Sequence, residues 1–210
     1  MRISWSATAV AFSLVLTGAI TRSSDCDAII AAVDARNSNL PNFTFHADVA
    51  VRMHHFPWLR FHLSGDGTYH RGHRYWVHFT KMPFFAKQVH DIDLSMLDPT
   101  LWPKNYRYTA VGIDGDDAIF ALQALHDPTL TKAQVALNEQ GADWVDATYN
   151  DGMHIHMSVT PAQTGAYLLP AKMDVAIDYP HMPLSASADF DAYQFDLALQ
   201  RPELRSARHR

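Results

Sequence analysis

The sequence predicts an α+β protein that is mainly antiparallel β, with one strongly curved sheet of about ten strands. Strand-length segments with an apolar residue at every second position recur along most of the chain, which is typical of a sheet with one buried face. One amphipathic helical segment precedes these strands, and one long segment without alternation follows the third strand. Because only these two segments are available to cover so wide an apolar face, we expect an incomplete β-barrel covered by an N-terminal helix and a helical insertion, with a cavity between them.

Residues 1–19 predict a cleaved signal peptide. They combine a positively charged start, a mostly apolar stretch at 3–16 and small residues at 17–19 that suit a cleavage site. We therefore expect a periplasmic or secreted protein, with an uncleaved anchor as the alternative. Residues 20–200 are expected to form a single domain, and the basic residues 201–210 a flexible tail.

Composition and cysteine content narrow the class of protein. The chain has 210 residues, of which 48% are hydrophobic, and this suits one domain with a sizeable core. The formal net charge of -5 does not favour a nucleic-acid partner, and we predict none. Cys26 is the only cysteine, which excludes an intrachain disulfide. Because Asp25 directly before it does not fit a bacterial lipidation signal, we interpret Cys26 as a small residue on the first helix, with lipidation as the alternative.

The first helix is predicted to begin at Ser24 or Asp25, whose side chains can accept bonds from the free amides of a first turn. It is predicted to end near Asn37. Such an amphipathic helix must pack its apolar stripe against an apolar surface. The stripe consists of Ile29, Ile30 and Val33.

The alternation is clearest in the first three strands. We predict strands over residues 43–54 and 59–63, joined by a Phe56–Pro57 corner, and a third over residues 75–79 after a turn at Gly65–Gly67. Histidines occupy the positions between the apolar ones, so we expect them on the outer face. These are His46, His54, His62 and His78. Seven further strands are predicted over residues 106–113, 118–125, 132–138, 143–149, 153–160, 172–178 and 186–199.

The segment Met82–Pro103 interrupts the strands and is rich in Phe, Met, Leu and Trp. Asp98 followed by Pro99 is a favourable start for a short helical turn. Long insertions of this kind usually serve a function, so we expect this one to act as a lid over the cavity.

This order of elements resembles the periplasmic outer-membrane lipoprotein carrier family, with its LolA/LolB-like fold. The resemblance rests on the export signal, the amphipathic first helix, the long alternating strands and the helical cover of an incomplete barrel. It extends to YLLPAKM at residues 167–173 and DFDAYQF at residues 189–195, which are similar to a Leu-Pro strand start and an aromatic-rich closing strand. The chain departs from the family in its histidine-rich outer face and in the corner at His55–Trp58.

The resemblance implies an envelope protein that binds acyl chains of lipids or lipoproteins without catalysis or a cofactor. It also implies a membrane-bound donor or acceptor, and we expect a monomer. Methionines on the inward-facing positions suit varied acyl chains because the thioether side chain is flexible. The predicted lipid-binding residues are Phe45, Val49, Val51, Met53, Phe61, Val77, Phe120, Met153, Ile155, Met157 and Val175.

A histidine-rich metal-binding module is one alternative, because His154 and His156 lie on the same face of one strand. A metal site needs three or four ligands that converge, which the sequence does not show, and we predict no bound metal. The sequence has no Gly-x-Ser-x-Gly motif. Asp91 and Asp93 beside His90 are explained equally well as helix caps, so we predict that the protein is not an enzyme. A non-catalytic partner-binding envelope protein is the other alternative.

Overall fold

The computed structural model describes residues 25–83, 91–179 and 183–196. The predicted signal peptide at residues 1–19 and the tail at residues 201–210 lie outside the described residues and stay predictions. Part of the predicted lid, residues 84–90, also lies outside them. Among the described residues, no helix is both long and apolar enough to cross a bilayer.

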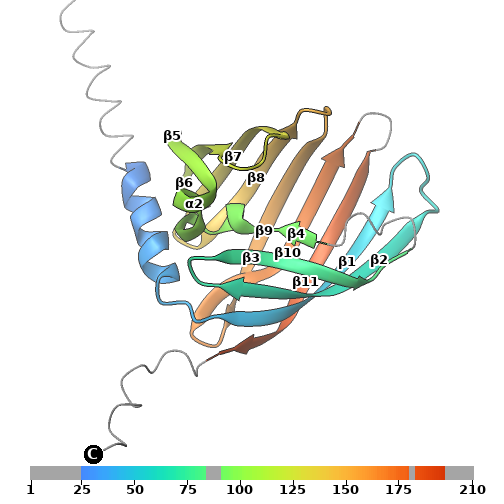
Figure 1. Cartoon of the computed structure of the whole chain (residues 1–210), viewed down its shortest axis with the longest axis horizontal. Coiled ribbons are helices and arrows are strands. Elements are labelled where there is room, and N and C mark those ends of the chain that lie inside the picture. The colour runs from blue at the N-terminus through green and yellow to red at the C-terminus, as the bar shows by residue number, and fades with distance from the viewer. Residues whose placement is uncertain (1–24, 84–90, 180–182, 197–210) are drawn as a thin grey trace, which may run out of the picture.

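The strands form one curved antiparallel sheet (Figure 1). Its order is β4-β3-β2-β1-β11-β10-β9-β8-β7-β6-β5, so the first and last strands meet in the middle. The end strands β4 and β5 do not pair with each other within the described chain, so the barrel is incomplete, as predicted. The strands are β1 (Phe43–Met53), β2 (Arg60–His70), β3 (Arg74–Lys81), β4 (Asp91–Asp93), β5 (Tyr106–Asp114), β6 (Asp117–Ala124), β7 (Leu130–Asn138), β8 (Gly141–Tyr149), β9 (His154–Thr164), β10 (Tyr167–Asp178) and β11 (Leu184–Phe195).

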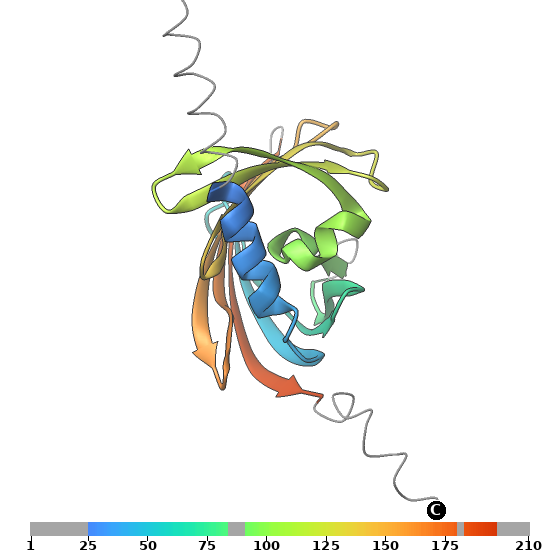
Figure 2. The same ribbon diagram turned by 90° about the vertical axis from the view of Figure 1, so that its left-hand side faces the viewer.

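Two helical elements lie on the concave side of the sheet (Figure 2). A helix covers residues 25–37, and its Cys26 and Val33 are fully buried. The described part of the insertion contains the 3₁₀ turns η2 (Ser95–Leu97) and η3 (Pro99–Leu101) and the short helix α2 (Trp102–Asn105). Leu101 and Trp102 are also fully buried. This part of the insertion is therefore packed into the core rather than laid over it.

The turn predicted at Gly65–Gly67 is wrong, because both glycines lie inside β2 and face the core. A Cβ at Gly65 would overlap the backbone of His78 on β3, and one at Gly67 would overlap the ring of Phe45 on β1. These glycines permit close approach instead of a reversal of the chain. The reversal comes at Gly72, whose φ of 68° lies in the left-handed region that favours glycine.

The sheet has eleven strands rather than about ten because the insertion contributes β4, which pairs with the edge of β3. The last strand begins at Leu184, before the predicted residue 186. Its predicted end at residues 197–199 lies outside the described residues.

Aromatic rings fill the core where β1 begins. Phe43 stacks on Tyr69 with ring centroids 4.8 Å apart, and Phe45 stacks on Tyr193 at 5.5 Å. Tyr75 meets Tyr69 edge to face at 5.5 Å. Offset and edge-to-face pairs are the favoured aromatic geometries, so this cluster fixes one end of the barrel.

Candidate functional site

The concave face holds a cavity of about 180 Å³ whose lining residues are all apolar. Its lining comes from the neighbouring strands β3, β2, β1, β11 and β10, with Ile92 on β4 and Leu94 directly after it. The lining residues are Val49, Val51, Phe61, Leu63, Val77, Phe79, Ile92, Leu94, Met173, Val175, Ile177, Leu184, Ala186, Ala188 and Phe190.

The floor of the cavity is a groove along β11, produced by two alanines between larger neighbours. Ala188 pairs with Val49 on one side and Met173 on the other. Ala186 pairs in the same way with Val51 and Val175. Directly paired side chains stand close together on a sheet, so a methyl between two bulkier groups leaves a channel along its strand. Leu184 and Phe190, which also line the cavity, flank the two alanines along β11.

Five of the eleven predicted lipid-binding residues line this cavity, and six do not. Those that line it are Val49, Val51, Phe61, Val77 and Val175. Two others lie deep in the core: Phe45 belongs to the aromatic cluster, and Phe120 packs edge to face on Trp102 at 5.5 Å. Met157 and Ile155 on β9 pair with the lining residues Val175 and Ile177 and are partly buried beside the cavity. Met53 pairs with Leu184, and Met153 lies in the turn before β9.

Sequence reasoning missed the alanines and several larger lining residues. Ala186 and Ala188 occupy alternate positions of the predicted strand over residues 186–199, on the same face as its inward-pointing residues. This alternation was the only feature of the sequence that could have identified them. Their position beside β1 depends on a pairing between the two ends of the chain, which periodicity does not reveal.

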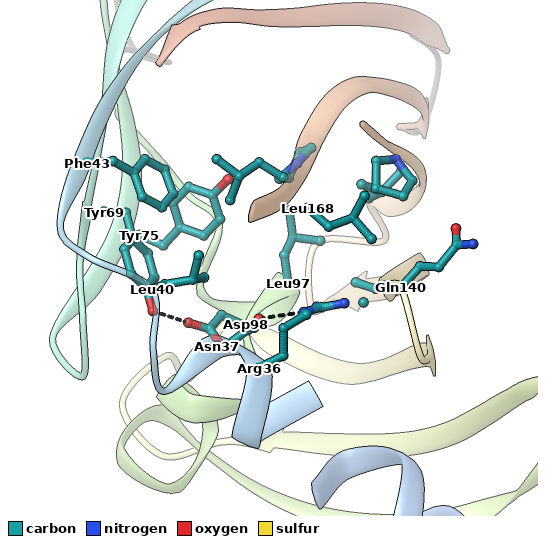
Figure 3. A pocket seen from close by; sticks show the side chains of 16 residues that line it. Arg36, Asn37, Leu40, Phe43, Tyr69, Tyr75, Leu97, Asp98, Gln140 and Leu168 are labelled. Carbon is teal, nitrogen blue, oxygen red and sulfur yellow. Dashed lines mark hydrogen bonds between the residues drawn. The ribbon is translucent and has the colours of Figure 1, made fainter. Parts of the chain in front are cut away.

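A buried polar network closes the other end of the barrel around a small cavity of about 50 Å³ (Figure 3). Asp98 is 3% exposed and accepts hydrogen bonds from Asn37 Nδ2 at 3.0 Å and Tyr69 Oη at 2.8 Å. Thr100 donates to the same carboxylate through its backbone amide and its hydroxyl. Burial raises the pKa of Tyr69, and the nearby Asp98 carboxylate raises it further, so the hydroxyl remains a donor. The network joins the N-terminal helix, β2 and the insertion.

Arg36 extends this network to the surface. Its Nε donates to Asn37 Oδ1 at 3.1 Å, and its Nη1 donates to the Glu139 carbonyl at 2.8 Å. Partial burial lowers the pKa of Arg36, while the Asp98 charge opposes this shift. The arrangement is a structural clamp, because these bonds join the first helix to β2, to the insertion and to the Glu139 carbonyl before β8.

The convex face carries histidines that pair with aspartates. His46 Nδ1 lies 2.9 Å from Asp66, and its Nε2 lies 3.0 Å from the Ser64 hydroxyl. The hydrogen bond to Asp66 is the main cause of a raised pKa at His46, and the charge of Asp48 adds to it. His156 lies 2.9 Å from Asp146.

The positions of these histidines and aspartates can be compared with the metal-binding and enzyme alternatives. His154 and His156 both approach Asp146, at 3.5 and 2.9 Å, but no group of three or more metal-ligating side chains converges in the described chain. Asp91 and Asp93 lie in strand β4, and Asp93 accepts a hydrogen bond from the Ser95 amide at 2.8 Å. The N-cap of η2 is Leu94, which makes no side-chain capping bond, so the two aspartates are not helix caps. Asp91 lies 2.7 Å from His78, and the third residue of the suggested group, His90, lies outside the described residues.

Cys26 lies on the first helix, as predicted, and the structure shows that it is fully buried. Its Sγ lies 3.4 Å from the Gly112 carbonyl on β5, so the helix contacts the far edge of the sheet. Burial is the largest cause of a raised pKa at this thiol.

The chain forms an open, curved antiparallel sheet around helical elements, with an apolar cavity lined by neighbouring strands. Solved structures of other proteins share this fold. A LolA superfamily protein from Nitrosomonas europaea superposes with a TM-score of 0.56 at 9% identity, covering 81% of this chain and 93% of that one. A domain assigned to outer membrane lipoprotein sorting from Vibrio parahaemolyticus gives 0.54 at 9% identity, covering 82% and 94%. A DUF1329 family protein from Desulfovibrio piger gives 0.56 at 8% identity, covering 83% and 92%.

These likenesses show that the chain has a LolA-like fold. No protein-family model matches the sequence, and no curated protein matches it. At 8–9% identity the likeness concerns the fold alone.

Proposed function

We propose that this protein is an extracytoplasmic carrier that binds the acyl chains of lipids or lipoproteins in the apolar cavity, without catalysis. The observation that carries this proposal is the cavity of about 180 Å³ lined by apolar residues alone, in which Ala186 and Ala188 of β11 lie between larger side chains. A polar ligand would find no hydrogen-bond partner among the lining side chains. An unbranched apolar chain requires none.

The size and chemistry of the cavity suit part of an acyl chain. An apolar cavity of about 150 Å³ is sufficient for a benzene-sized group, and this one measures about 180 Å³. Each buried methylene contributes about 0.8 kcal/mol. Six methylenes would therefore contribute about 5 kcal/mol before the cost of ordering the ligand, which suits reversible binding.

The predicted signal peptide supports an activity outside the cytoplasm, and we propose the periplasm as the compartment. The Vibrio parahaemolyticus domain, assigned to outer membrane lipoprotein sorting, supports that choice. In the proposed cycle a monomer receives its cargo from a membrane-bound donor and delivers it to an acceptor membrane.

Filling the groove tests the proposal. Ala186→Leu adds bulk to the cavity floor, whereas Ala176→Leu adds the same bulk to the convex face of the neighbouring strand β10, where Ala176 pairs with Ser185. We expect Ala186→Leu to weaken binding of a fluorescent fatty acid by about tenfold or more, equivalent to about 1.4 kcal/mol. Ala176→Leu should bind like the wild type. Equal binding by all three proteins would contradict the proposed site.

A further inference from the structure

The tip of the β1–β2 hairpin, residues 54–59, exposes two large aromatic side chains. Trp58 is 79% exposed and Phe56 is 47% exposed, and their rings meet edge to face at 5.6 Å. The hairpin projects at the end of the molecule remote from the N-terminal helix (Figure 1). Single exposed apolar residues are ordinary on protein surfaces, but a contacting aromatic pair on a projecting tip indicates an interaction site.

The tip is held in place by hydrogen bonds. The Leu59 amide donates to the Phe56 carbonyl at 2.7 Å, and the Met53 amide donates to the Leu59 carbonyl at 3.3 Å. His54 donates its amide to the Pro183 carbonyl at 3.0 Å, which ties the hairpin to the segment before β11. Pro57 further restricts the backbone between the two rings. The aromatic side chains are therefore presented by an ordered turn.

Two arginines stand side by side at the base of the tip. Arg52 and Arg60 are direct cross-strand partners, and both are exposed. Like charges directly opposite each other destabilise a sheet. Neither guanidinium has a carboxylate partner within the described part of the chain. This basic pair stands out on a chain whose formal net charge is -5, and it suits an external anionic surface.

Exposed aromatic side chains beside two arginines without carboxylate partners are suited to binding at a membrane surface. Trp and Phe enter the region between headgroups and acyl chains, while arginines contact anionic headgroups. We propose that residues 54–59 form a membrane-docking element that inserts Trp58 and Phe56 into the surface of an anionic phospholipid bilayer.

Docking at this tip turns the cavity toward the bilayer. Val51 and Phe61, which line the cavity, are cross-strand partners immediately next to Arg52 and Arg60. Leu184 lies at the same end of the groove and pairs with Met53. The short path between cavity and bilayer rests on the proposed carrier function. The docking itself does not.

Vesicle co-sedimentation of the exported protein, purified from the periplasm of an expressing bacterium, tests the docking element. The vesicles contain phosphatidylethanolamine and phosphatidylglycerol, and a parallel series contains phosphatidylcholine alone. We expect the wild type to bind the anionic vesicles. The double variant Phe56→Ser/Trp58→Ser should bind them about tenfold more weakly. Arg52→Gln/Arg60→Gln should lose the preference for anionic over neutral vesicles.

Matched controls separate docking from folding and from cargo binding. Val111→Ser removes a 56% exposed apolar residue from β5 and should leave vesicle binding unchanged. Ala186→Leu should still bind vesicles, and Phe56→Ser/Trp58→Ser should still bind a fluorescent fatty acid. If the wild type ignores anionic vesicles, or if the tip variant binds them as well as the wild type, the docking proposal is overturned. The first result would point to a protein partner at the tip.

Discussion

The hydroxyl of Tyr69 on β2 donates a hydrogen bond of 2.8 Å to the buried carboxylate of Asp98, which begins the 3₁₀ turn η3. Asn37, at the end of the first helix, donates to the same carboxylate at 3.0 Å. One carboxylate thus ties both helical elements to the sheet. The apolar cavity lies at the opposite end of β1, where no comparable network occupies the space between the described elements.

Removing the carboxylate should destabilise the protein strongly. Asp98→Ala leaves the buried donors of Asn37, Tyr69 and Thr100 without an acceptor, and we expect a loss of about 3 kcal/mol or more in the free energy of unfolding. Asp116→Ala, at an exposed turn position, should change it by about 0.5 kcal/mol at most. Urea unfolding measures both. Similar unfolding midpoints for the two variants would show that the network is not a clamp.

The His46–Asp66 pair should make stability depend on pH. The pKa of His46 is raised in the folded protein, mainly by its hydrogen bond with Asp66. Its contribution is therefore fully present below the unfolded pKa of about 6.5 and is lost as the pH rises through the folded pKa. His46→Gln should lose more stability relative to the wild type at about pH 5.5 than at about pH 8.

Urea unfolding at both pH values compares His46→Gln with His62→Gln. His62 is an exposed histidine whose cross-strand partner on β1 is Ala50. A deficit for His46→Gln that is larger at the higher pH would contradict the assigned direction of the pKa shift.

Ala192 on β11 offers a stabilising substitution. Its φ is 50°, and it lies at the irregularity where the pairing of β1 with β11 shifts between Thr44 and His46. A side chain costs about 1–2 kcal/mol in this left-handed conformation, whereas glycine adopts it freely and loses about 0.5–1 kcal/mol through its more flexible unfolded state. We expect Ala192→Gly to stabilise the protein by about 0.5 kcal/mol.

Ala188→Gly on the same strand is the matched control for Ala192→Gly. Ala188 is buried in extended backbone, so the glycine there should destabilise the protein. The midpoint of thermal unfolding shows directly whether each substitution stabilises or destabilises the protein. If both substitutions lower the midpoint, the left-handed conformation carries no strain.

The general architecture could be predicted because period-two alternation places side chains on opposite faces of a strand. Val49 and Val51 were assigned to the concave face in this way, and they line the cavity. The same reasoning failed for Phe120, which shares the inward parity but is covered by Trp102 from the insertion. Parity identifies a face of the sheet but not the neighbour that covers it.

Long-range pairing accounts for most of the remaining differences. The groove exists because β11 lies between β1 and β10, so that Ala186 faces Val51 and Val175. Nothing local to Ala186 indicates those neighbours. Gly67 was interpreted as a turn residue for a similar reason: its role depends on the ring of Phe45 on another strand.

Native mass spectrometry of protein purified gently from its own host is the most direct test of the carrier proposal. We predict that the wild type carries a co-purifying lipid or lipopeptide. Val51→Glu should lose it, because the carboxylate would enter an apolar cavity. Ala50→Glu, on the exposed face of the same strand, should retain it. A wild-type protein that is empty, and that also fails to bind fluorescent fatty acids and lipopeptides, would contradict the carrier function.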